Sequence, residues 1–131
     1  MKGIYILEIL LERDLEIKVG SMGTVRFKKG AYAYVGSAMG GLEQRIKRHL
    51  RKEKSLHWHI DYLLNEAKIV GVGIKQTRRK YEECLTAGKL HENNGLPIKG
   101  FGSSDCRCGS HLIYFKNEKI ILPAGFKKIK P

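Results

Sequence analysis

The run from Gly3 to Leu11, GIYILEILL, constrains the fold most strongly, because it is apolar at nearly every position. Its β-branched and aromatic residues are typical of a strand that is buried on both faces. We expect such a strand near the middle of a sheet. The chain of 131 residues is long enough for one compact core and too short for two ordinary domains. We therefore predict a single domain over residues 1–124, followed by a basic, loosely held tail at 125–131.

Turn signals and apolar stretches predict further strands around this run. The segment Gly20-Ser21-Met22-Gly23 predicts a hairpin connection, because glycine permits the positive φ angles of a tight turn. Strands are expected at 15–19, 24–27, 31–36, 68–74, 111–115 and 119–122, the last two forming a closing hairpin. The segment 95–109 holds four glycines and a proline, which predicts a loop. The fold class is therefore α+β, with a small, mainly antiparallel central sheet flanked by helices.

Apolar residues at helical spacing indicate helices in three places. The first helix begins at Leu42. Ser55 is expected to cap the second, and the third runs from Arg78 to about Leu90, before Asn93-Asn94-Gly95. The residues expected to face the core are Leu42, Ile46 and Leu50 in the first helix, Leu56, Ile60, Leu63, Leu64 and Ala67 in the second, and Tyr81, Cys84, Leu85 and Gly88 in the third.

The charge balance indicates a polyanionic partner. The chain has 25 Lys and Arg against 13 Asp and Glu, a formal net charge of +12. Nucleic acid is favoured over a membrane, since the sequence has no long apolar run, no signal peptide and no basic amphipathic helix with bulky aromatics. A solvated lysine-rich surface is the alternative explanation. Three cysteines, an odd number, predict a reducing compartment, and we expect the cytoplasm.

Two tripeptides and one helix carry the functional signal. Gly3-Ile4-Tyr5 is followed by Tyr34-Val35-Gly36, then by Arg45 nine residues after Gly36 and His49 four residues later. This ordered set resembles the core of the GIY-YIG nuclease superfamily. The 28 residues between Tyr5 and Tyr34 exceed the usual spacing, and the hairpin at 15–27 accounts for the surplus.

Two longer motifs narrow the resemblance. HWHIDYLL at 57–64 and GFGSSDCRCGSHLIYF at 100–115 resemble a small branch of that superfamily. Members of the branch occur alone or joined to an endonuclease III-like DNA glycosylase. The resemblance therefore implies DNA repair or processing, with DNA glycosylase-type proteins as possible associates.

The resemblance also implies a catalytic set. It consists of Tyr5, Tyr34, Arg45, His49 and Glu83. One tyrosine would orient or deprotonate the attacking water with help from His49, and Arg45 would bind phosphate oxygens through its planar fork. Glu83 would hold one Mg²⁺ or Mn²⁺ ion, with Glu82 left open as the alternative. Each assignment has a structural alternative. The two tyrosines could be aromatics that pack on the sheet, and Arg45 and His49 could form an ordinary solvated helix face. Glu83 could pair with Lys80 or Arg79 on its own helix.

Three further groups are candidates. Expected nucleic-acid contacts are Gly36, Ser37, Lys47, Arg48, Arg51 and Lys52. A loop near the site would contain Ser104, Asp105, Cys106, Cys108 and His111. Its thiols and imidazole, with Cys84, are possible zinc ligands, but Cys-x-Cys is a cramped spacing for a tetrahedral site, and we prefer the loop without zinc. In His57-Trp58-His59 we expect a helix start with a buried Trp rather than a DNA-facing patch, with His57 able to pair with Asp61.

These patterns predict a metal-dependent endonuclease that hydrolyses DNA phosphodiester bonds in a single step without a covalent intermediate. RNA is not excluded as substrate. Two alternatives stay open: a catalytically inactive nucleic-acid-binding module of the same fold, and a zinc-stabilised adaptor, which would lose its fold on chelation.

Overall fold

The structure, a computed structural model, describes residues 1–102, 109–116 and 119–129. Its main sheet has six strands, and all neighbouring strands in it are antiparallel. Their order across the sheet is β6 (Leu96–Pro97), β7 (Leu112–Phe115), β4 (Gly30–Ala38), β1 (Gly3–Leu11), β5 (Lys68–Gln76) and β8 (Lys127–Ile129). The apolar run at the N-terminus is thus an inner strand, and the predicted α+β class is confirmed.

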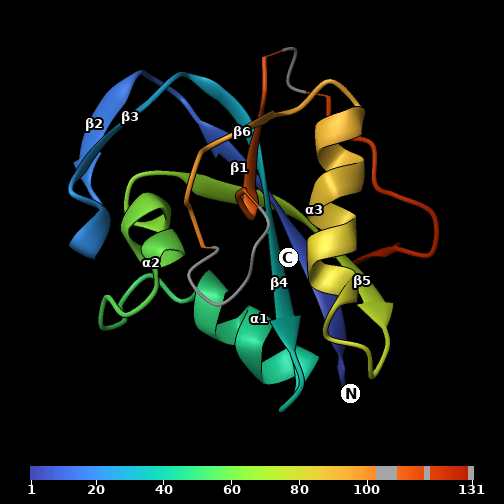
Figure 1. Ribbon diagram of the computed structural model, residues 1–131. Helices are drawn as coiled ribbons and strands as arrows, with labels where there is room; N and C mark the ends of the chain where they lie inside the picture. Colours follow the sequence, from blue (N-terminus) through green and yellow to red (C-terminus); the bar gives the residue numbers. More distant parts are fainter. Residues whose placement is uncertain (103–108, 117–118, 130–131) are drawn as a thin grey trace.

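Helices cover both faces of this sheet (Figure 1). On one face, Tyr5, Leu7 and Ile9 of β1 pack into a core with α1 (Leu42–Leu50) and α2 (His59–Leu64). On the other face, Ile4 and Ile6 pack into a second core with α3 (Glu82–Glu92). Because successive side chains of a strand point to opposite faces, this single strand supplies both cores.

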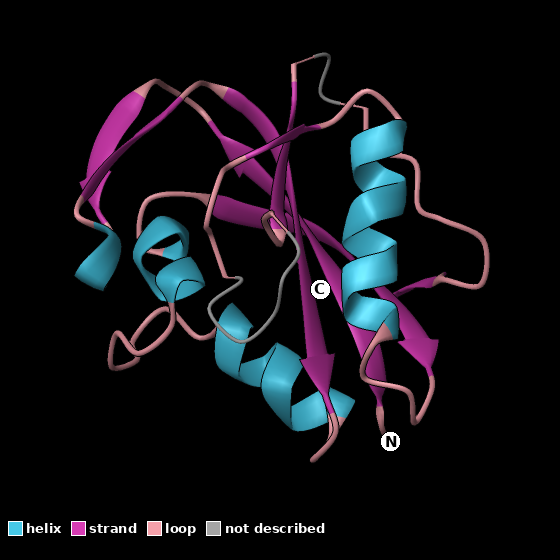
Figure 2. Ribbon diagram, in the orientation of Figure 1, coloured by secondary structure: helices cyan, strands magenta, loops and turns pink. Residues whose placement is uncertain are grey.

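The expected extra hairpin is present. β2 (Leu15–Lys18) and β3 (Thr24–Phe27) form a separate two-stranded sheet, which projects at the upper left in Figure 2. A 3-10 turn, η1 (Gly20–Met22), joins them, with Gly20 at φ +45°. The side chain of Phe27 is fully buried and anchors the hairpin to the core.

The predicted closing hairpin is wrong. β7 pairs with β4 and β6, and residues 119–122 form no strand. The tail prediction is also wrong for Lys127–Ile129, which forms edge strand β8 on β5 and is tied to β1 by an ion pair of 3.3 Å between Lys128 and Glu8. The physical reason is burial, because all four residues of β7 are buried and need an inner position, whereas a basic strand suits an exposed edge.

Several helix details also differ from expectation. In α1, His49 occupies a buried position, while Leu50 is exposed. The second helix begins at His59 rather than after Ser55, so Leu56 is exposed. Part of the loop predicted at 95–109 pairs with β7 as the short strand β6.

The core face of α3 was mispredicted as well. Tyr81 and Leu85 are exposed, whereas Thr86, Ala87 and Leu90 point inward. Thr86 is the polar residue on this inner face, and its buried hydroxyl has a hydrogen-bond partner within the helix. It donates to the carbonyl oxygen of Glu82 at 2.7 Å. The helix end predicted at Asn93-Asn94-Gly95 is confirmed, with Asn94 in the left-handed region at φ +70°.

Within the ranges that the structure describes, no helix is both long and apolar enough to cross a bilayer.

Candidate active site

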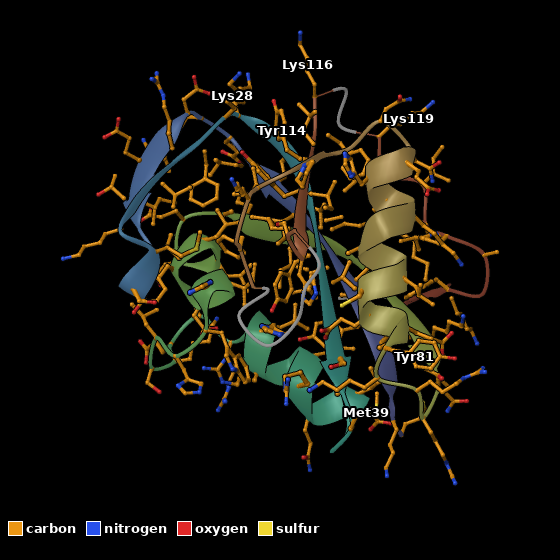
Figure 3. The ribbon with its side chains drawn as sticks, viewed as in Figure 1. Lys28, Met39, Tyr81, Tyr114, Lys116 and Lys119 are labelled. Carbon is orange, nitrogen blue, oxygen red and sulfur yellow. The ribbon has the colours of Figure 1, made fainter. Side chains whose placement is uncertain are left out.

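A pocket of about 710 Å³ opens where the N-terminal half of β1, the end of β4 and the start of α3 come together. Four members of the predicted catalytic set line it: Tyr5, Tyr34, Arg45 and Glu83. Gly36, Ser37 and His111 also belong to the lining. Two other lining residues, Met39 after β4 and Tyr81 before α3, are labelled in the lower right part of Figure 3.

The fifth member, His49, lies behind Tyr5. The Tyr5 hydroxyl is 2.7 Å from Nε2 of His49, and both side chains are almost fully buried, at 1% and 2% exposure. Burial raises the pKa of Tyr5 well above 10 and lowers the pKa of His49 to about 4. Both groups are therefore neutral at pH 7, and the hydroxyl donates to Nε2. Among the described residues, none is a hydrogen-bond partner for Nδ1 of His49.

Tyr5 can occupy this position because Gly36 has no side chain. β1 and β4 pair so that Tyr5 lies directly opposite Gly36. A Cβ at Gly36 would overlap the Tyr5 ring. The glycine, which we expected to contact nucleic acid, therefore has a packing role. It leaves room for the tyrosine to cross the strand toward α1.

Tyr34 stands next to this pair on the neighbouring strand. Its ring centroid lies 6.4 Å from that of Tyr5 and 6.0 Å from that of His49. Burial raises its pKa, and the nearby carboxylate of Glu83 raises it further. The neutral phenol is therefore the resting form of both tyrosines.

Arg45 brings positive charge into the pocket. Its Nη1 donates to the backbone carbonyl oxygen of Ser37 at 3.1 Å, and its guanidinium lies 4.6 Å from the ring centroid of Trp58. No ion pair joins Arg45 to a carboxylate in the described part of the chain. Its charge opposes the effect of burial on the Tyr5 pKa. The pocket thus holds a cation that is available to an anionic ligand.

The structure separates the two candidate metal ligands. Glu83 lines the pocket, and its Oε1 is 3.4 Å from Nδ1 of His111. Glu82 turns away, with its carboxylate 2.8 Å from Lys75 and 3.6 Å from Arg79. The pairing that we considered for Glu83 is therefore made by Glu82.

Two of the four possible zinc ligands are adjacent. Sγ of Cys84 lies 3.7 Å from Nε2 of His111, which is buried. The other two, Cys106 and Cys108, lie outside the described residues, as do Ser104 and Asp105. Among the described residues, no three His, Cys, Asp or Glu side chains form a group suited to hold a metal ion.

The candidate nucleic-acid contacts fall into two kinds. Lys47, Arg51 and Lys52 are exposed, and the last two line a second groove of about 340 Å³ beside α1. Arg48 instead binds the buried carboxylate of Asp61 through both terminal nitrogens, at 2.9 Å each. We expected Arg48 to contact phosphate, but its fork is occupied.

The HWHID segment contributes more to the pocket than we expected. Trp58 is half-buried and lines the pocket, together with His57 and His59. Asp61 does not pair with the ring of His57. It accepts the backbone N–H groups of His57 and Trp58, at 2.9 Å each. The sequence feature that could have indicated this role is the cluster His57-Trp58-His59, which places polar and aromatic side chains together at the start of an apolar helix.

These features define a small α+β domain with a basic pocket built from two tyrosines, an arginine and a carboxylate, and a histidine behind one tyrosine. A family model described as "Domain of unknown function DUF123" matches residues 4–129, nearly the whole chain, so the protein belongs to this family. No curated protein and no solved structure matches the chain significantly.

Proposed function

We propose that this protein is a metal-dependent endonuclease of the GIY-YIG type that hydrolyses DNA phosphodiester bonds. The observation that carries the proposal is convergence. Tyr5 and Tyr34 from the sheet, Arg45 from α1 and Glu83 from α3 line one pocket, although they are far apart in the sequence. His49 reaches the same group by its hydrogen bond to Tyr5. A purely structural helix does not need this grouping.

Arg45 is the expected phosphate ligand. A guanidinium presents several N–H donors in one plane, which suits two phosphate oxygens at once. One terminal nitrogen is used by the Ser37 carbonyl group. The donors that neither Ser37 nor the Tyr5 oxygen uses are available to the substrate, and the positive charge of the guanidinium stabilises the additional negative charge of the transition state.

The Tyr5–His49 pair supplies a route for the proton of the attacking water. As the water oxygen attacks phosphorus, its proton passes to the Tyr5 oxygen, and the Tyr5 proton passes to Nε2 of His49. The P–O3′ bond breaks, and the released 3′ oxygen takes up a proton from solvent. Because the His49 pKa is about 4, the imidazolium is a transient carrier and returns its proton afterwards.

Glu83 would hold the divalent cation. It is the carboxylate among the described pocket-lining residues, and a single carboxylate completed by waters suits Mg²⁺ or Mn²⁺. When bound, such a cation neutralises charge on the phosphate and on the leaving oxygen. The repair context and the association with DNA glycosylase-type proteins rest on the resemblance alone and form part of the proposal.

The test is nicking of supercoiled and branched DNA with Mg²⁺ or Mn²⁺. We expect Arg45→Ala and Glu83→Ala to lower the rate at least 100-fold. Glu82→Gln is the matched control, because Glu82 is adjacent but pairs with Lys75 away from the pocket. Equal activity in all four proteins would indicate a contaminating nuclease and contradict the proposal.

The second candidate is an inactive nucleic-acid-binding module of the same fold. It is favoured by the burial of Tyr5, whose hydroxyl is engaged and whose pKa is raised. The same preparations distinguish the two: DNA or RNA binding that depends on Arg45, without nicking by the wild type, supports the binding module.

A further inference from the structure

Arg45 is held by contacts that use only part of its set of N–H donors, including a hydrogen bond to the Tyr5 oxygen. The Ser37 carbonyl oxygen takes one hydrogen bond, and the Trp58 ring, 4.6 Å away, supports the guanidinium from its face. Stacking on an indole uses the π face of the guanidinium and does not consume its N–H groups. A flexible cationic side chain thus gains a fixed orientation without losing its capacity to bind an anion.

The Trp58 ring is itself held in place. Arg48 lies 4.2 Å from the centroid of the same ring, and both of its terminal nitrogens bind Asp61. Asp61 is fully buried and also accepts the backbone N–H of Trp58. One carboxylate therefore fixes the backbone of the tryptophan and the arginine that packs on its ring.

The Asp61 carboxylate is ionised at neutral pH, as it must be to hold Arg48 and the backbone of Trp58. Burial alone would raise its pKa, but the hydrogen bonds from Arg48 and from the backbone of Trp58 and His57 outweigh burial and lower the pKa below its ordinary value. Asp61 is consequently ionised at neutral pH and keeps Arg48 engaged. The two neighbouring arginines are thereby given different tasks, since Arg48 binds a carboxylate and Arg45 faces the pocket.

We propose that Trp58 is a positioning residue for Arg45. Its ring, fixed by Asp61 and Arg48, holds the Arg45 guanidinium in the orientation that binds the scissile phosphate. The catalytic consequence rests on the proposed function, whereas the positioning itself does not. Without the ring, Arg45 samples several rotamers, and only the fraction that faces the pocket binds the anion, so the apparent affinity falls to that fraction of its intrinsic value.

The first test is a double-mutant cycle on the binding of a short duplex oligonucleotide without divalent metal. Trp58→Leu is expected to weaken binding about tenfold, and Trp58→Phe to restore most of it. In an Arg45→Gln background, Trp58→Leu should change the affinity less than twofold. An equal loss in both backgrounds would show that Trp58 acts on its own and would overturn the proposal.

A second measurement separates positioning from the proposed function. The Arg45 guanidinium carbon lies over the indole, so the Nε–H proton signal of Arg45 in the ¹⁵N-labelled protein should be shifted by the ring current. Trp58→Leu should return it to the value of a solvated arginine, and Asp61→Asn should move it partway. If the wild-type protein neither binds nor nicks DNA, the proposed function fails while this shift still decides the positioning. An Arg45 signal unchanged by Trp58→Leu refutes it in either case.

Discussion

The burial of His49 makes the stability of the folded protein sensitive to acid. The pKa of His49 is about 4 in the folded protein, below its ordinary value of 6.5. Between these values the unfolded chain binds more protons than the folded one, so stability is fully present above about pH 6.5 and is lost as the pH falls. Burial also lowers the pKa of the other buried imidazole, His111. Its contribution to stability is therefore lost in the same direction, as the pH falls.

We therefore expect the free energy of unfolding to fall by roughly 3 kcal/mol from His49 alone between pH 7 and pH 4. His49→Gln should flatten this part of the profile, because its amide oxygen accepts the Tyr5 hydroxyl but does not titrate. Urea unfolding at several pH values in this range gives the slope of the free energy of unfolding against pH for the wild type and for His49→Gln. Identical slopes in the two proteins would show that His49 does not carry the effect.

Gly36 is the residue that gives Tyr5 its place. In Gly36→Ala, the new methyl group overlaps the Tyr5 ring, so the ring must move away from His49. We expect a loss of about 1–3 kcal/mol in stability from overpacking, together with loss of nicking. Gly40→Ala is the matched control, since Gly40 also lines the pocket but has nothing within 4 Å of the added Cβ. Thermal unfolding of both variants tests this difference, and equal melting temperatures contradict it.

At the scale of elements, α1 is the helix expected to contact DNA. It carries Arg45 into the pocket and exposes Lys47, with Arg51 directly after its end. The hairpin β2–β3 is also basic at Lys18 and Arg26, but contributes no residue to the pocket lining. We infer that the inserted hairpin stands apart from the bound strand.

If α1 contacts DNA and the β2–β3 hairpin does not, variants of the two elements should differ in how DNA affinity depends on salt. Lys47→Ala and Arg51→Ala should each reduce the slope of log affinity against log salt by about 0.9, as expected for one lost phosphate contact on duplex DNA. Lys18→Ala and Arg26→Ala should leave the slope unchanged. Binding titrations between low and moderate salt give the slopes directly. A reduced slope for the hairpin variants would show that the hairpin lies on the DNA.

Local patterns predicted the elements that depend on local information. The inner strand at Gly3–Leu11, the strand at Gly30–Ala38 and the start of α1 at Leu42 follow from apolar patterning and glycine positions. The partners of β7 and the edge strand Lys127–Ile129 depend on pairing between distant segments. A short stretch of sequence carries no information on such distant pairing. A hairpin between the adjacent segments 111–115 and 119–122 was therefore the simpler interpretation.

The site was predictable in part for the same reason. The tripeptides and the spacing of Arg45 and His49 indicated one face of a helix beside two strands. The division between Arg48 and Arg45 was not predictable, because it depends on Asp61 from another helix. Glu82 and Glu83 flank the predicted stripe equally in sequence. The structure separates them, because Lys75 on β5 pairs with Glu82 while His111 lies beside Glu83.

At the scale of the whole molecule, the pocket draws on both sides of the sheet. Tyr5 and Tyr34 belong to the core under α1 and α2, whereas Glu83 belongs to α3 on the opposite face. The ends of the central strands bring these layers together. The inner strands β1 and β4 are buried and paired on both sides, so they position the two tyrosines and the helices that carry the charged groups.

Metal removal distinguishes a catalytic ion from a structural one. We expect EDTA to abolish nicking and to leave the thermal unfolding curve within about 2 °C, because a cation on Glu83 with mostly water ligands contributes little to folding. A large drop in melting temperature would instead indicate a structural zinc ion near Cys84 and His111. Metal analysis of the purified protein then identifies the ion.

The proposed function requires that the Tyr5 hydroxyl take part in phosphodiester hydrolysis. The most direct test is the single-turnover cleavage rate of Tyr5→Phe, which removes one oxygen and keeps the ring. Tyr32→Phe is the control, since Tyr32 is buried in the same core but donates its hydroxyl to the Lys28 carbonyl oxygen outside the pocket. We predict that Tyr5→Phe binds DNA normally and cleaves at least 100-fold more slowly, while Tyr32→Phe cleaves at the wild-type rate. Cleavage by Tyr5→Phe at the wild-type rate would contradict the claim.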